Sequence, residues 1–207
     1  IYQLAALSRE HPEELETADR FLMVPEYLNY LLTGNMVNEY TNATTTNLVN
    51  ARTCTWDAFA LEAAEAPARL FGEIAMPGTV VGGLAPEVQE RVGFDARVML
   101  PATHDTGSAF LAVPARDAQA VYLSSGTWSL LGVEHEGPIT SDASRYQNFT
   151  NEGGYLKRFR FLKNIMGLWM IQSIRRELNG VSYVAGKGAQ LKRAAKEIGF
   201  GDLADAA

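Results

Sequence analysis

The chain has 207 residues, which is enough for one large or two smaller domains with a sizeable core. Hydrophobic residues make up 47% and charged residues 20%, as in ordinary globular proteins, and no apolar run is long enough to predict a membrane span. The net charge of −6 argues against non-specific binding of nucleic acid. A single cysteine, Cys54, excludes a disulfide within the chain and favours a reducing compartment, so we expect a cytoplasmic protein.

Both ends of the sequence have the character of cuts through a longer protein. The chain begins at Ile1, without a methionine, inside a helical pattern. It stops at Ala207 without a clear last element. We therefore expect further chain on both sides.

The first half of the sequence predicts helices around a polar segment. Residues 13–33 carry apolar side chains at helical spacing, interrupted at Pro25, where we expect a new first turn, and ended by Gly34 as a C-cap. Residues 37–50 are rich in Thr and Asn, which indicates a loop or short strands. Further elements are expected as helices over 57–66, 68–71 and 86–92, the last closed by Gly93, and as a strand and turn over 76–83.

A polar triplet, His104-Asp105-Thr106, follows a predicted buried strand over 97–102 and begins a small-residue helix over 106–113. Asp105 has two interpretations: it is a plain helix N-cap, or its carboxylate accepts the proton of a substrate hydroxyl. No histidine lies at a metal-site spacing from His104, so a positioning hydrogen bond is the better hypothesis for that side chain.

The second half changes character and predicts hairpins. Strands over 120–125 and 127–134 flank a turn, Ser124-Ser-Gly-Thr127, and a second hairpin over 149–164 contains Gly153-Gly154. The first turn is either a plain hairpin tip or a phosphate cradle, because Gly126 permits close backbone approach and Thr127 can donate to phosphate oxygens.

A strong helix is expected over 165–178, with Asn164 as its N-cap and Gln172 two turns further on. Asn164 could turn its polar groups toward a cleft, whereas Gln172 is more simply solvated. Four basic residues precede this helix and favour a solvated hairpin face, although they could also face an anion: Lys157, Arg158, Arg160 and Lys163. The Gly-x-Ser-x-Gly elbow of a serine hydrolase is missing from the sequence.

Taken in order, these segments resemble the central portion of the rhamnulokinases, within the FGGY family of carbohydrate kinases. The resemblance covers nearly the whole chain, is sharpest from residue 100 to 172, and rests on long motifs in the family's order. The motifs are Leu32-Thr-Gly34, Glu39-Tyr-Thr-Asn-Ala-Thr-Thr-Thr46, Thr103-His-Asp-Thr-Gly-Ser-Ala109, Tyr122-Leu-Ser-Ser-Gly-Thr-Trp-Ser-Leu130, Thr150-Asn-Glu-Gly-Gly154 and Leu162-Lys-Asn-Ile-Met-Gly-Leu-Trp169.

The resemblance implies an α/β fold of the actin-like (ribonuclease H-like) ATPase class, with parts of two domains around a cleft. Residues 1–114 would be the C-terminal part of the family's N-terminal domain, and residues 115–207 the N-terminal part of its C-terminal domain. The implied activity is phosphorylation of L-rhamnulose to L-rhamnulose 1-phosphate with ATP and Mg²⁺. Sugar and ATP are the expected partners, nucleic acid and membrane are not, and the oligomeric state is left open.

The resemblance also implies roles for single residues. Asp105 would be the catalytic base; His104, Asp105, Thr106 and Asn164 would bind the sugar; Thr127 and Gln172 would bind the nucleotide; and no protein side chain is assigned to a metal. The family's Gly-rich phosphate turn and its late Gly-Gly adenosine motif are missing from these 207 residues, so we expect the chain alone to be inactive. Two alternatives stay open: an FGGY kinase for another ketose or polyol, and a non-catalytic member that binds sugar or a partner.

Overall fold

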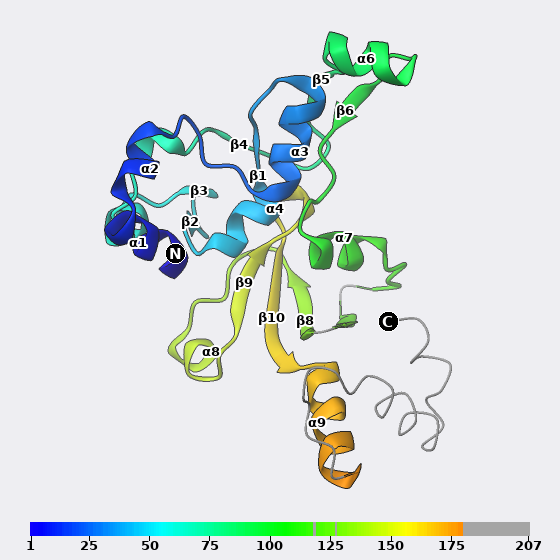
Figure 1. Cartoon of the computed structure of the whole chain (residues 1–207). Helices are drawn as coiled ribbons and strands as arrows, with labels where there is room; N and C mark the ends of the chain where they lie inside the picture. Colours follow the sequence, from blue (N-terminus) through cyan, green and yellow to red (C-terminus); the bar gives the residue numbers. More distant parts are fainter. Residues whose placement is uncertain (118, 127, 180–207) are drawn as a thin grey trace. The chain divides into compact units, whose positions relative to one another are not determined.

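The structure is a computed structural model of the chain, and it describes residues 1–117, 119–126 and 128–179 (Figure 1). The chain divides into two compact units. The first holds residues 1–124 and 130–164, and the second holds residues 125–129 and the chain from residue 165 onward. The domain division predicted at residues 114 and 115 concerns the fold of a longer protein and stays a prediction.

The N-terminal helices follow the predicted pattern in part, because residues 18–23, inside the predicted helical stretch, are not helical. These helices are α1 (Tyr2–Glu10), α2 (Pro12–Thr17) and α3 (Val24–Thr33). Pro25 lies in the first turn of α3, where its missing N–H costs nothing, and Gly34 ends the helix with a left-handed φ of 77°. The predicted interruption at Pro25 and the predicted C-cap at Gly34 are both confirmed.

The Thr- and Asn-rich segment is more ordered than a loop. It forms β1 (Asn38–Glu39), α4 (Tyr40–Ala43), the 3-10 helix η1 (Thr44–Thr46) and β2 (Val49–Asn50). β1 pairs in parallel with β4 (Ile74–Ala75), and β2 pairs antiparallel with β3 (Thr55–Trp56). Next come α5 (Ala58–Ala63), which begins one residue after its N-cap Asp57, and the 3-10 helix η2 (Ala68–Leu70).

The strand before the polar triplet differs from the prediction. β6 (Arg97–Met99) pairs antiparallel with β5 (Val80–Gly83), and α6 (Pro86–Val92) connects them and ends at Gly93 as expected. Arg97 and Met99 are exposed, because this pair is a two-stranded ribbon with no further strand beside it in the described chain. The prediction of a buried strand over 97–102 is therefore wrong, although Leu100 and Ala102, just beyond β6, are buried.

The second half forms a four-stranded sheet in the order β7-β8-β10-β9. Its strands are β7 (Val121–Ser125), β8 (Trp128–His135), β9 (Thr150–Gly153) and β10 (Phe159–Met166). Both predicted hairpins are thus confirmed. The helices of this half are α7 (Asp105–Ala112), α8 (Asp142–Tyr146), the 3-10 helix η3 (Tyr155–Lys157) and α9 (Leu168–Asn179).

The prediction that Asn164 caps the last helix is wrong. β10 continues through Met166, so α9 begins only at Leu168 and Asn164 lies within a strand. β9 pairs with β10 only as far as Leu162, and β8 is the neighbour on the other side of β10, which stays extended through a region whose apolar spacing also suits a helix.

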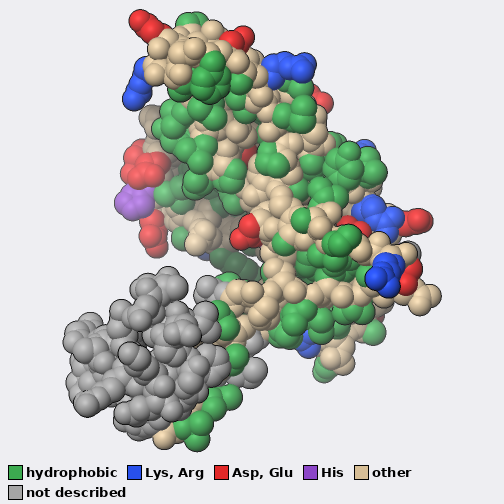
Figure 2. All heavy atoms as spheres, turned by 90° about the vertical axis from the view of Figure 1, so that its right-hand side faces the viewer, with side chains coloured by type: hydrophobic (Ala, Val, Ile, Leu, Met, Phe, Trp, Pro, Cys, Tyr) green, Lys and Arg blue, Asp and Glu red, His purple; other side chains and the backbone are tan. Residues whose placement is uncertain are grey.

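Burial in the first unit is unusually polar. The apolar cluster of Leu48, Leu61 and Ala64 packs against α1, while fully buried polar and charged side chains lie around β1 and β10: Glu26, Asn38, Glu39, Thr41 and Arg160. Figure 2 shows hydrophobic side chains exposed on the face that it presents. The exposed apolar residues on or next to α6, β6 and α7 are Val92, Phe94, Met99, Leu111 and Val113. Within the described residues, no helix is long and apolar enough to cross a membrane.

Candidate active site

The buried carboxylate of Glu39 connects two distant segments of the chain. It accepts hydrogen bonds from the backbone N–H groups of Thr41 and Asn42 at the start of α4, at 2.8 and 3.1 Å, and from the Thr41 hydroxyl at 2.6 Å. It also accepts from the N–H and the hydroxyl of Thr103, at 3.1 and 2.7 Å. Five donors thus converge on one fully buried side chain, and they fix the residue that directly precedes His104.

A second buried carboxylate, Glu26 of α3, holds β1 from the other side. It accepts hydrogen bonds from the Glu39 N–H and the Asn38 side chain, both at 2.8 Å, and from the Met23 N–H at 2.8 Å. Burial raises the pKa of Glu26 above its ordinary value, and these hydrogen bonds oppose the rise only in part. The end of β1 is therefore a rigid, polar base for the segment that carries the triplet.

The triplet lies at the N-terminus of α7, as predicted, but with a different capping pattern. His104 is the N-cap and makes no side-chain capping bond, and Asp105 is the first residue of the helix. The interpretation of Asp105 as an N-cap is wrong. Its side chain is 97% exposed, and one oxygen, Oδ1, accepts from the Thr106 N–H at 2.6 Å. The carboxylate is thus held at a rigid helix start and stays open to a reacting molecule.

His104 has polar contacts through its backbone and through both ring nitrogens, while its predicted positioning role stays a prediction. Its backbone N–H donates to the Thr41 hydroxyl at 3.3 Å, and its Nδ1 lies 3.1 Å from Nη2 of Arg160 and 3.4 Å from Oε2 of Glu152. Nη2 of Arg160 also donates to Oε2 of Glu152 at 3.2 Å. The other ring nitrogen, Nε2, lies 3.6 Å from Oδ1 of Asp105.

Arg160 contradicts the simple interpretation of the basic hairpin as a solvated face. Its side chain is only 1% exposed, and it lies directly opposite Glu152 in the antiparallel β9–β10 register. Arg158, by contrast, is half-exposed and lies 3.8 Å from Glu134. Arg158 precedes β10, whereas Arg160 lies within it opposite Glu152, so basic residues that are close in sequence can differ in burial.

Glu152 makes the stability of this cluster depend on pH. Burial by itself would raise the pKa of its carboxyl, but a hydrogen bond from the protonated form of the His104 ring and the positive charge of Arg160 outweigh burial and hold the pKa below its ordinary value of 4.5. The ionised carboxylate therefore contributes stability above about pH 4.5, and this contribution is lost as the pH falls through the lower folded-state pKa.

We expect Glu152→Gln to lower the free energy of unfolding at neutral pH. The difference from the wild type should become smaller as the pH falls below about 4.5. Urea denaturation at a series of pH values measures this difference, with Glu134→Gln on the same sheet as the matched control. A deficit that stays constant down to pH 3 would contradict the assignment.

The remaining site residues predicted from the sequence occupy separate places. Thr106 is buried in α7, and Asn164 is exposed on β10. No hydrogen bond joins Asn164 to the triplet among the residues that the structure describes. Thr127 lies outside the described residues. Gln172 is exposed on α9 and belongs to the second unit, which we describe by itself.

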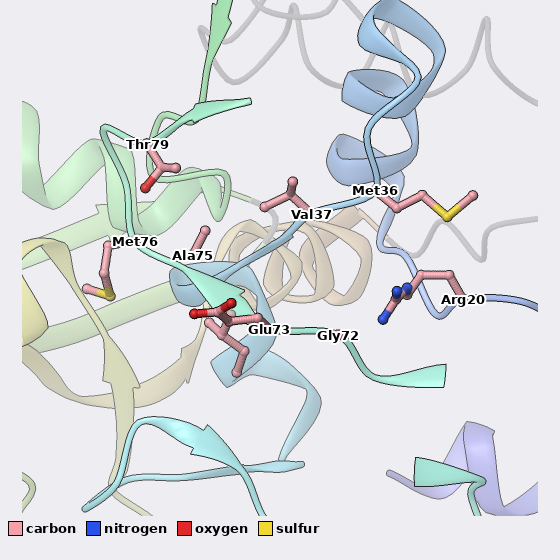
Figure 3. A pocket seen from close by; sticks show the side chains of 9 residues that line it. Arg20, Met36, Val37, Gly72, Glu73, Ala75, Met76 and Thr79 are labelled. Carbon is pink, nitrogen blue, oxygen red and sulfur yellow. The ribbon is translucent and has the colours of Figure 1, made fainter. Parts of the chain in front are cut away.

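A pocket of about 610 Å³ lies elsewhere in the first unit. Its lining comes from the segments around Arg20, Met36–Val37 and Gly72–Thr79, beside β4 (Figure 3). A smaller pocket of about 260 Å³ shares Gly72, Glu73, Ile74 and Met76 with it. Of the predicted site residues that the structure describes, none lines either pocket.

Sequence reasoning missed Glu39, Glu152 and Arg160, the three charged residues that hold the triplet in place. Glu39 and Glu152 both lie in motifs that carried the family resemblance, but neither has a spacing that would mark it as a partner of His104. The signal available in the sequence was weak, namely the glycine at position 107 inside a predicted helix. In the structure, a Cβ at Gly107 would meet the guanidinium of Arg160.

Comparisons with known proteins agree with the fold. Residues 1–112 match the family model described as "FGGY family of carbohydrate kinases, N-terminal domain". Among curated proteins, the chain is 55% identical over 179 residues to the rhamnulokinase of Oceanobacillus iheyensis, covering 86% of this chain and 38% of that protein. It is 53% identical over 206 residues to the rhamnulokinase of Halalkalibacterium halodurans, covering 99% of this chain and 43% of that protein.

Two solved structures are similar in fold. A xylulose kinase from Lactobacillus acidophilus superposes with a TM-score of 0.73 at 21% identity, covering 84% of this chain and 35% of that one. A gluconate kinase from the same organism gives a TM-score of 0.73 at 20% identity, covering 93% and 39%. The predicted α/β fold of the actin-like class is confirmed. The chain spans about two fifths of the length of the curated relatives that it matches.

Proposed function

The chain belongs to the FGGY family of carbohydrate kinases, and from this membership we infer that the complete protein transfers a phosphoryl group from ATP to the 1-hydroxyl of L-rhamnulose. The names of the relatives with 53–55% identity support L-rhamnulose as the sugar. The structural observation that carries the proposal is the exposed Asp105 carboxylate at the start of α7, held in place through the Glu39–Thr103 contacts.

Phosphoryl transfer to the sugar hydroxyl depends more on the position of the base than on its strength. Phosphoryl transfer passes through a loose transition state, so catalysis rests on alignment and on stabilisation of charge. In our proposal, Asp105 accepts the hydrogen bond and then the proton of the sugar hydroxyl as that oxygen attacks the γ-phosphorus. His104, Thr106 and Asn164 bind the sugar around it. The helix N-terminus adds a positive field that suits the carboxylate.

ATP would supply the transferred phosphoryl group, and Thr127 and Gln172 are the residues that we assign to it. The described part of the neighbouring turn fits this role, since Ser125 and Gly126 are exposed. Among the described residues, a Cβ at Gly126 would meet the Trp128 carbonyl oxygen alone, at 3.7 Å. Mg²⁺ would arrive with the nucleotide, because protein sites hold it mainly through phosphates, water and one or two carboxylates. The described residues contain no cluster of three or more His, Cys, Asp or Glu side chains for a metal.

The direct test is a coupled ADP-release assay of the complete protein with L-rhamnulose, run beside a panel of other ketoses and polyols. We expect the highest kcat/KM for L-rhamnulose and a 1-phosphate product by ³¹P NMR. A clear preference for another sugar would contradict L-rhamnulose as the substrate but would still support kinase activity. Absence of turnover with every sugar would favour a non-catalytic member of the family.

A further inference from the structure

Arg160 contacts a ring nitrogen of His104 and thereby favours one of the two neutral protonation patterns of that ring. A guanidinium carries five N–H donors and no acceptor, so a nitrogen that it contacts must offer a lone pair. Nη2 of Arg160 lies 3.1 Å from Nδ1 of His104. In the neutral imidazole, Nδ1 is then the acceptor and the proton lies on Nε2.

The second ring nitrogen is the one that faces the proposed base. Nε2 of His104 lies 3.6 Å from Oδ1 of Asp105, so an N–H on that nitrogen points its positive end toward the carboxylate and toward the space beside it. A lone pair on Nε2 would instead face an anionic oxygen. The tautomer of His104 therefore decides whether this ring attracts or repels the carboxylate and the sugar oxygens that approach it.

Glu152 competes for the same nitrogen. Its Oε2 lies 3.4 Å from Nδ1 of His104 and can only accept a proton there, which requires the opposite tautomer. Nη2 of Arg160 lies 3.1 Å from the nitrogen and 3.2 Å from Oε2 of Glu152, so it can donate to both when Nδ1 carries no proton. Without Arg160, the carboxylate of Glu152 would be the polar group nearest to Nδ1 and would draw the imidazole proton to that side.

The surroundings of Arg160 are built around its buried guanidinium. The side chain is 1% exposed, and its Nε and Nη1 have no hydrogen-bond partner among the described residues. Gly107, inside α7, lies so close that a Cβ there would collide with Nη1 and the central carbon of the guanidinium. A side chain at this position of α7 would have to displace the guanidinium, so the glycine leaves room for the arginine.

We propose that Arg160 is a positioning residue, which fixes His104 in its Nε2–H tautomer and aims that N–H at the Asp105 carboxylate and the bound sugar. The inference rests on the proposed function only for its effect on catalysis, because the tautomer exists whatever the sugar is. Arg160 touches neither the reacting atoms nor Asp105; it acts through His104.

The tautomer can be read directly in the complete protein. Histidine is labelled with ¹⁵N, and the imidazole nitrogens are observed in a long-range ¹H–¹⁵N correlation spectrum at about pH 8, where histidine is ordinarily neutral. The signals of His104 are those that disappear in His104→Gln. We expect the Nε2–H pattern in the wild type and a shift toward Nδ1–H in Arg160→Met, with Arg158→Met, from the same hairpin, unchanged.

A second variant keeps the arginine and its charge. Gly107→Ala displaces the guanidinium while improving the helix propensity of α7, so it should move the tautomer in the same direction as Arg160→Met even if the latter folds poorly. An Nδ1–H pattern in the wild type would overturn the proposal. So would an unchanged Nε2–H pattern in a folded Arg160→Met or Gly107→Ala protein.

The kinetic consequence is measured separately. With L-rhamnulose as substrate, we expect Arg160→Met to lower kcat/KM for the sugar by about 10- to 100-fold while KM for ATP stays within about twofold, because a misplaced positioning group costs up to about 10²-fold. Equal losses for sugar and ATP would indicate a general structural defect and would count against the proposal. If the wild type phosphorylates no sugar, the proposed function fails, and the NMR measurement still decides the role of Arg160.

Discussion

Asp105→Asn is expected to lower kcat of the complete protein on L-rhamnulose by about 10² to 10⁴-fold, the usual contribution of a positioned general base. The amide keeps the size and shape of the side chain but can no longer accept the hydroxyl proton. Because the side chain is 97% exposed and its one hydrogen-bonded oxygen can be replaced by the amide oxygen, the fold should be retained. Steady-state kinetics together with a thermal melt check both parts of this expectation.

The matched control is Asp142→Asn. Asp142 is also exposed and is also the first residue of a helix, α8, so the substitution changes the same charge in the same local setting. We expect its kcat to equal that of the wild type. If Asp105→Asn is as active as this control, Asp105 is not the base, and the non-catalytic alternative gains weight.

Glu39→Ala should destabilise the first unit by about 3 kcal/mol or more, because it leaves several buried donors without an acceptor and each such group costs about 1–3 kcal/mol. The three backbone N–H groups that lose their partner belong to Thr41, Asn42 and Thr103. Glu39→Gln keeps one acceptor oxygen and should lose less. Urea denaturation measures the free energy of unfolding for both variants.

Hydrogen exchange gives a local readout of the same change. We expect the amides of Thr103 and His104 to exchange faster in Glu39→Ala, since both are tied to the Glu39–Thr41 cluster. Glu62→Ala, an exposed position on α5, serves as the control and should stay within about 0.5 kcal/mol of the wild type. Equal stability of Glu39→Ala and Glu62→Ala would show that Glu39 does not hold this segment.

The sequence-based predictions are accurate where a structure depends on residues close in sequence, and less accurate where it depends on partners far away in sequence. Pro25, Gly34 and Gly93 mark helix boundaries that depend on one or two residues, and the structure places the boundaries there. Asn164 was predicted from the same kind of local pattern and lies in a strand instead, because β10 belongs to a sheet, beside β8, and this long-range association outweighs the helical spacing. Local propensity is a weak guide wherever a long-range partner competes.

The candidate site divides in the same way. The triplet His104-Asp105-Thr106 and its place at a strand-to-helix junction could be predicted, since both depend on neighbours in sequence. The roles of Glu39, Glu152 and Arg160 could not, because Glu39 reaches Thr103 across 64 residues and Arg160 reaches His104 across 56. The position of a charged residue in the sequence does not predict which distant residue it will contact in the interior.

The sequence by itself determined the family, the mixed α/β architecture and the residue that we propose as the base, because long motifs in a fixed order carry that information without coordinates. Only the tertiary structure decided that Asp105 follows the helix cap instead of forming it, that Arg160 is buried instead of solvated, and that His104 is held between opposing charges. The physical reason is that burial and charge pairing depend on which strands and helices meet, and a buried charge is tolerated only where the fold supplies its partner.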